Sequence, residues 1–213
     1  MSIAPHLRAG IAVFATFALS LTPWHHGGGN AFDPLEATRA VMPAPHTFEL
    51  RDEADAALAQ WALTQFERAG LALPPLVLAF HDDKEQCGGH SGYFRSGTPA
   101  RVDICGFNWN RFIIGAKKTI LHELGHAWAY TLTEEARQRF VDHRGLTTWG
   151  DDRSPWEEQG SEQTAEIIAW ALLDQEPRMS SIPDSHPLAL ARAYSQLTGT
   201  MPVLRVLEVL HGA

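Results

Sequence analysis

The chain has 213 residues and a mass of 23.5 kDa, enough for one domain with a short appendage. A hydrophobic fraction of 45% and a charged fraction of 20% are ordinary for a soluble globular protein, which excludes a disordered or polytopic membrane chain. The formal charge of −8 argues against nucleic acid as a partner, because phosphate contacts require a surplus of Lys and Arg. Two cysteines are too few for a site of four thiolates, whereas 11 histidines direct attention to metal chemistry.

The amino terminus has the pattern of an export signal. Residues 9–21 form an apolar run without a charge, and His6 and Arg8 precede it. The run is shorter than the roughly 20 residues of a membrane-spanning helix, and Pro23 follows soon after it. We therefore expect a secreted or extracytoplasmic protein, which contacts a membrane only if residues 9–21 remain as an uncleaved anchor.

Three segments follow from this pattern. We expect residues 1–22 to be a signal peptide or N-terminal anchor, residues 23–47 a linker rich in Gly, Pro and His, and residues 48–213 the folded domain. Within that domain strand patterns come first and helix patterns follow, which indicates the α+β class, with a small mixed or antiparallel sheet before a mainly helical half. The expected strands are 76–80, 92–95 and 101–105, and the expected helices are 52–69, 116–132, 134–144, 160–174, 187–197 and 202–210.

The most informative motif is the segment HELGH at residues 122–126, which has the form H-E-x-x-H. On a helix, His122 and His126 lie about 40° apart, so both imidazoles can reach one ion. Glu123 lies close enough to orient a water on that ion. Gly125 costs about 1 kcal/mol relative to Ala inside a helix, which suggests that another element packs closely against it.

A catalytic zinc site has three protein ligands and an open position. A third histidine in the metzincin spacing is absent, since Leu132 stands where it would be. The helix expected over 160–174 is apolar nearly all round, yet it carries Glu162 and Glu166. Buried carboxylates are costly unless they are paired or bind a metal, so one of the two glutamates is expected to be the third ligand. The residues alone leave that choice open, and attraction to the helix dipole is the other explanation for Glu162.

The HELGH helix, followed some forty residues later by a helical E-x-x-A-E, resembles the gluzincin zinc metallopeptidases. The segment EQTAE at residues 162–166 is most similar to lethal-factor-type peptidase domains and their small secreted bacterial relatives. The resemblance covers about residues 117–170 and implies a zincin-like fold, a Zn²⁺ cofactor and a peptide or protein substrate. It implies hydrolysis of peptide bonds by a zinc-activated water, with Glu123 as general base.

The resemblance also implies more detailed roles. Glu162 would be the zinc ligand and Glu166 would support the site or be the alternative ligand. A substrate strand would lie along a sheet edge, which we expect at Arg101–Cys105. Gluzincins commonly steady the oxyanion with a Tyr or His, and His143 and Tyr130 are the candidates for this role or for contact with the substrate. The uncertain oxyanion partner leaves open a second function, a non-catalytic, zinc-stabilised extracellular binding module. Glu123 favours the enzyme, because a purely structural site is closed by four ligands.

The two cysteines, Cys87 and Cys105, flank the expected hairpin. In an exported chain they would meet an oxidising compartment, so we expect a disulfide that staples the sheet next to the substrate. A loop of this length contributes about 3 kcal/mol by the chain-entropy estimate. The alternative is a pair of buried, unlinked thiols.

Overall fold

A computed structural model of the chain describes residues 46–107, 113–151, 153–174 and 180–202, all within one compact unit, Pro43–Ala213. The expected signal peptide or anchor lies outside these residues. So do all but the end of the expected linker and all but the first residue of the helix expected over 202–210. Among the described residues, no helix is long and apolar enough to cross a membrane.

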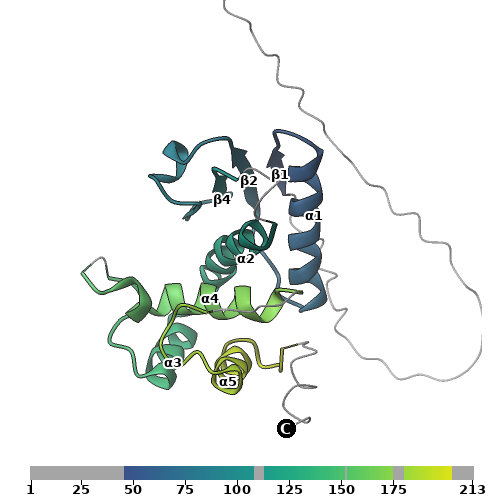
Figure 1. Cartoon of the computed structure of the whole chain (residues 1–213). Helices are drawn as coiled ribbons and strands as arrows, with labels where there is room; N and C mark the ends of the chain where they lie inside the picture. Colours follow the sequence, from purple (N-terminus) through teal and green to yellow (C-terminus); the bar gives the residue numbers. More distant parts are fainter. Residues whose placement is uncertain (1–45, 108–112, 152, 175–179, 203–213) are drawn as a thin grey trace, which may run out of the picture. The chain divides into compact units, whose positions relative to one another are not determined.

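The described residues form a small four-stranded mixed sheet and five α-helices, which confirms the expected α+β class (Figure 1). The expected strands and helices within this part of the chain are all present, with shifts of a few residues at their ends. The short strand β1 and two short 3-10 helices, η1 and η2, were not expected. The elements are β1 (Thr47–Glu49), α1 (Glu53–Arg68), β2 (Leu76–His81), η1 (Glu85–Cys87), β3 (Gly92–Arg95), β4 (Ala100–Cys105), α2 (Ile113–Ala129), α3 (Glu134–Arg144), η2 (Trp156–Glu158), α4 (Gly160–Leu172) and α5 (Pro187–Thr198).

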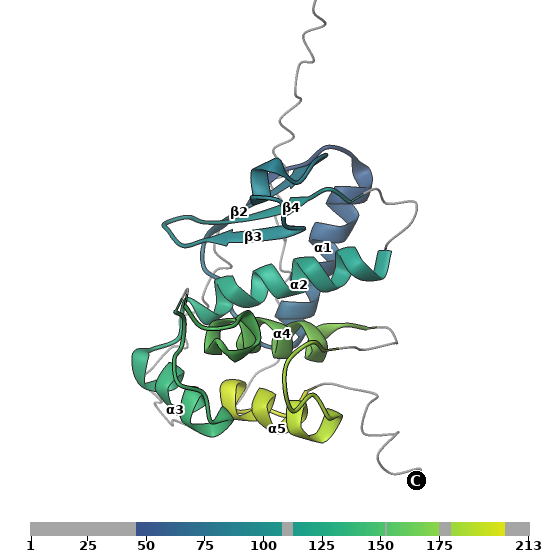
Figure 2. The same ribbon diagram turned by 60° about the vertical axis from the view of Figure 1, so that its left-hand side comes forward.

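The sheet has the strand order β1-β2-β4-β3. β1, β2 and β4 are parallel, and β3 runs antiparallel to β4. The expectation that Arg101–Cys105 forms the edge is therefore wrong. This strand, β4, lies between β2 and β3, because its hairpin partner takes the outer position. β3 lies at the edge, on the side of the sheet nearest α2 (Figure 2).

The helices extend the sheet into successive layers. α2 packs against β3 and β4 on one side and against α4 on the other, and α5 covers the far side of α4 (Figures 1 and 2). In α4, only Ser161 and Glu162 are not buried. This confirms the burial that its apolar composition predicts. Any carboxylate on this helix therefore needs a partner to offset its desolvation.

Candidate metal centre and its cleft

The H-E-x-x-H histidines meet a glutamate from α4. The Nε2 atoms of His122 and His126 lie 3.2 Å apart, one helical turn from each other on α2. Glu162, in the first turn of α4, places its Oε2 3.2 Å from each of these nitrogens. The three side chains are partly buried, and their three donor atoms form a group that could hold a metal ion.

The spacing of these donors fits a metal ion. Three atoms that are 3.2 Å from one another match three corners of a tetrahedron whose centre is about 2.0 Å from each, which is the bond length of nitrogen and carboxylate ligands to a catalytic metal. The fourth corner has no protein ligand among these residues, so a water or a substrate atom could bind there. The donor set is the open, three-ligand kind rather than a closed structural site.

Glu166 supports this centre without belonging to the donor triangle. Its Oε2 lies 3.4 Å from Nδ1 of His122, the ring nitrogen that faces away from Glu162. Its Oε1 pairs with Nζ of Lys118 at 2.7 Å and accepts a hydrogen bond from the backbone N–H of Ser181 at 3.0 Å. A carboxylate in this position fixes which nitrogen of His122 carries the proton and leaves Nε2 for the metal. The structure thus puts Glu162 inside the donor triangle and Glu166 outside it, behind His122.

The electric field of the site favours a cation. Burial alone would lower the pKa of His122, but its contacts with Glu162 and Glu166, together with the charge of Glu123, raise that pKa to about 9. Burial acts against ionisation of Glu162, yet the two histidines hold the pKa of this carboxyl far below its usual range. The glutamates therefore place enough negative charge around the Nε2 atoms to attract a positive ion.

Glu123 lies next to His122 on α2 and faces β3. It is only 8% exposed, and burial raises its pKa despite the nearby His122 and His126. Gly92 of β3 lies directly against it, since a Cβ at residue 92 would be 2.5 Å from Glu123 Oε1. A carboxylate with a raised pKa beside an open metal position is suited to accept a proton from water near neutral pH.

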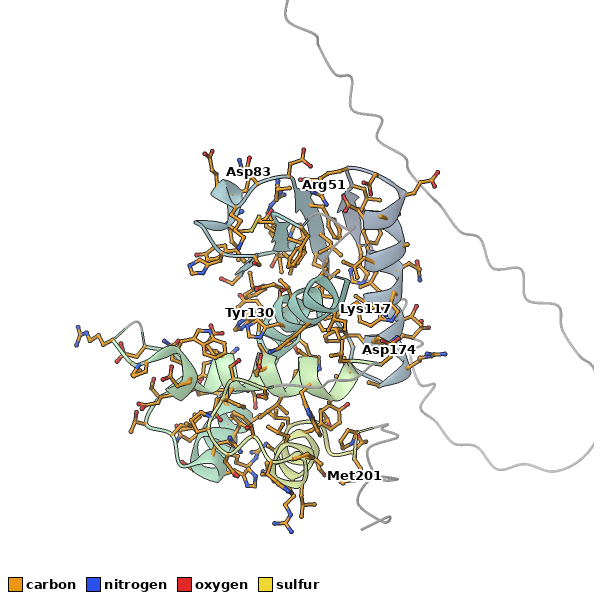
Figure 3. All side chains as sticks on the ribbon, in the orientation of Figure 1. Arg51, Asp83, Lys117, Tyr130, Asp174 and Met201 are labelled. Carbon is orange, nitrogen blue, oxygen red and sulfur yellow. A yellow bond between two sulfur atoms is a disulfide. The ribbon has the colours of Figure 1, made fainter. Side chains whose placement is uncertain are left out.

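A cleft of about 700 Å³ opens above the donor triangle and is lined by residues of α2, β3, η2 and α4. Tyr130, one of the two expected oxyanion or substrate residues, lines this cleft just beyond the end of α2 and is 48% exposed. Figure 3 shows it on the opposite side of α2 from Lys117. His143 does not reach the cleft. It lines a separate cavity with Arg144 and Asp184, because its helix α3 packs against α5 and α4.

The expected disulfide between Cys87 and Cys105 is present, and both cysteines are buried. It joins η1 to the end of β4, next to the turn that carries His90 into the cleft. Gly88 and Gly89 in this turn have positive φ angles of 60° and 92°, which glycine adopts without strain. The bridge therefore fixes the loop that leads into β3.

Several residues of the site were not found from the sequence. Lys118 precedes His122 by four residues, so helical spacing was a signal that could have revealed it. Gly92, Phe94 and His90 come from the hairpin region and Trp156 from η2, and no spacing rule connects them to the HELGH motif. Comparison with known proteins adds no further residues, since no family model, curated protein or solved structure matches this chain.

Proposed function

We propose that this protein is a zinc-dependent peptidase of the gluzincin type. The observation that carries the proposal is the position of Glu123. This buried carboxylate with a raised pKa lies beside a three-donor metal centre that has an open corner in a cleft. A structural metal site has no use for such a base and is normally closed by a fourth ligand.

Zinc suits the donors, since two imidazoles and one carboxylate form the ligand set of many zinc hydrolases. When bound, zinc supplies a water of lowered pKa and polarises a carbonyl oxygen. The chain's own residues would do the rest. Glu123 would take the proton of the attacking water and pass it to the leaving amine. Tyr130 and His90, which both line the cleft, are two side chains that could donate toward the developing oxyanion.

The edge of the sheet supports a peptide as the substrate. The backbone carbonyl of Ser91 accepts a hydrogen bond from the backbone N–H of Cys105 at 2.9 Å. Along an antiparallel pair of strands, residues that are hydrogen-bonded to the partner strand alternate with residues that are not. Gly92 and Phe94 therefore direct their backbone N–H and C=O groups away from β4, to the open edge beside the cleft. An extended peptide can pair with such an edge and hold its backbone in a fixed register. β3 takes the role that we had expected of Arg101–Cys105.

The disulfide supports the proposal that the peptidase acts outside the cytoplasm, because such bridges persist in oxidising compartments. The apolar run at residues 9–21 agrees with export, either as a cleaved signal or as an anchor. The substrates would then be extracytoplasmic peptides or proteins.

The proposal is tested by metal analysis together with a cleavage assay. We expect the purified chain to contain about one zinc per molecule and to cleave members of a fluorescence-quenched peptide library, with activity lost on chelation and restored by zinc. Glu123→Gln should keep the zinc and lose cleavage, because it removes the base without removing a ligand. His126→Ala should lose both.

Two results would contradict the proposal. Iron in place of zinc would point to the oxygen chemistry that other two-histidine, one-carboxylate sites perform. A zinc-loaded parent chain that cleaves no peptide in the library would favour the non-catalytic binding module instead.

A further inference from the structure

Each metal-binding histidine has an aromatic ring stacked beside it in the cleft. The indole of Trp156, in η2, lies 6.0 Å from the imidazole of His122, with the ring planes 22° apart. On the other side of the centre, the ring of Phe94 in β3 lies 6.1 Å from the imidazole of His126, with the planes 16° apart. Two aromatic groups therefore flank the position of the metal.

The group beside His126 continues along the cleft. The ring of Tyr130 lies 6.1 Å from that of Phe94 and is tilted by 54° to it. Both residues line the cleft, as does Trp156. The histidines against which the two groups stack, His122 and His126, are one helical turn apart, about 6 Å along α2.

These aromatic side chains are unusually open to solvent. Trp156 is 41% and Tyr130 48% exposed, and both belong to the small set of large hydrophobic side chains that are exposed in the described part of the chain. If the aromatic rings served only to orient the two imidazoles by stacking, they could do so while buried. Apolar surface that stays exposed and gathers at a concave site is typical of a surface that a ligand covers.

We propose that the cleft selects peptides with a large apolar side chain, aromatic or aliphatic, on each side of the scissile bond, one bound against Trp156 and the other against Phe94 and Tyr130. This inference rests on the proposed peptidase function and specifies its substrate.

The first test uses binding and does not depend on catalysis. The probes are acetohydroxamate and its benzyl-bearing counterpart, 3-phenylpropionohydroxamate, titrated into the zinc-loaded Glu123→Gln chain. Both probes bind a metal through the same group and differ only in the apolar arm. We expect the benzyl probe to bind at least about tenfold more tightly, the gain that burial of a phenyl group provides.

The variants then assign the subsites. The benzyl arm should occupy one of the two subsites. If it lies against Trp156, Trp156→Ala should remove most of this tenfold preference, and if it lies against Tyr130, Tyr130→Ala should do so. Trp156→Phe, which keeps a ring, should retain it in part. Phe48→Ala is the matched control, since Phe48 is an aromatic residue that is 42% exposed on β1 and does not line the cleft. It should change nothing.

In the active chain, cleavage sites in the peptide library should show large apolar residues at both flanking positions. Trp156→Ala should relax the preference at one position and Phe94→Ala at the other. Equal affinity for the two hydroxamates, or a preference that survives both substitutions, would overturn the inference and leave the peptidase function intact. If neither hydroxamate binds the zinc-loaded chain, the open metal position is wrong and both proposals fail.

Discussion

Gly125 of α2 and Ala165 of α4 are in backbone contact. A Cβ built on Gly125 would lie 3.0 Å from Cα of Ala165 and 3.2 Å from its carbonyl oxygen. This confirms the close packing that a glycine inside the HELGH helix predicts. The contact lies between the histidines of one helix and the glutamates of the other, so it sets the distance across which Glu162 reaches the two imidazoles.

Gly125→Ala should therefore damage the metal centre more than the fold. The new methyl group forces α2 and α4 apart at a cost of about 1–3 kcal/mol, and better helix propensity offsets about 1 kcal/mol of this. We expect a modest loss of unfolding free energy in urea and a loss of zinc affinity of about tenfold or more in competition with a chelator. Gly150→Ala is the control, because its Cβ would meet only Ser161 Oγ at 3.5 Å. Unchanged zinc affinity in Gly125→Ala would show that the helix spacing does not set the site.

The features that the sequence predicts correctly are those whose residue pattern lies within a single helix or hairpin. His122 and His126 belong to one helix, and their convergence follows from helical geometry alone. The helices and the β3–β4 hairpin likewise have patterns contained in their own residues. Gly125 could be interpreted because its cost is local, although its partner Ala165 could not be named from the sequence.

The rest depends on contacts between distant segments. β1 is three residues long and wholly exposed, so it has no apolar alternation and exists through its pairing with β2. The edge position of β3 is a property of the whole sheet, not of either hairpin strand. His143 was a reasonable candidate by residue type, but the packing of α3 directs it to another cavity. Trp156 reaches the cleft only through the fold of the loop before α4.

The two glutamates of α4 should respond differently to substitution. Glu162→Ala removes a donor, so we expect its zinc content after dialysis to fall to near zero. Glu166→Ala removes the group that orients Nδ1 of His122, and such losses typically weaken metal binding by about 10–100-fold. Its zinc should therefore be weakened but measurable in a chelator competition. The assignment must be reversed if Glu166→Ala empties the site while Glu162→Ala leaves it full.

Two neighbouring lysines on α2 allow a test of whether the Lys118–Glu166 ion pair contributes to metal binding through His122. Lys118 pairs with Glu166 at 2.7 Å. Lys117 instead pairs with Asp174 at 3.1 Å (Figure 3) and lies over the ring of Trp61. Lys118→Met leaves the buried Glu166 without its cation and should lower zinc affinity several-fold, with partial recovery in Lys118→Arg. Lys117→Met removes the same charge from the same helix and should affect stability alone. Equal zinc affinities in the two methionine variants would refute the role of Lys118.

The disulfide should contribute to stability rather than to metal binding. All three metal donors come from α2 and α4, whereas the bridge joins η1 to β4. Replacement of both Cys87 and Cys105 by Ala should lower the free energy of unfolding by about 3 kcal/mol in urea, by the loop-entropy estimate. Zinc content should stay at the parent level. A double variant as stable as the parent would show that the bridge does not stabilise this fold.

Gly92→Ala tests the role of Glu123 as a base without removing a metal ligand. A methyl group at this position would lie 2.5 Å from Oε1 and 2.6 Å from Cγ of Glu123, closer than atoms can approach, so the carboxylate must move. The three atoms nearest to this methyl group all belong to Glu123 and none belongs to the three donors, so zinc content should stay at the parent level. We expect peptide cleavage to fall by about 10²-fold or more, since misplacement of a catalytic group by about 1 Å has an effect of that size.

Gly97→Ala, in the tip of the same hairpin, is the control: its Cβ would meet the carbonyl oxygen of Pro99 at 3.1 Å and no residue of the cleft. Full activity in Gly92→Ala, with zinc retained, would mean that Glu123 does not act from the position that β3 holds it in.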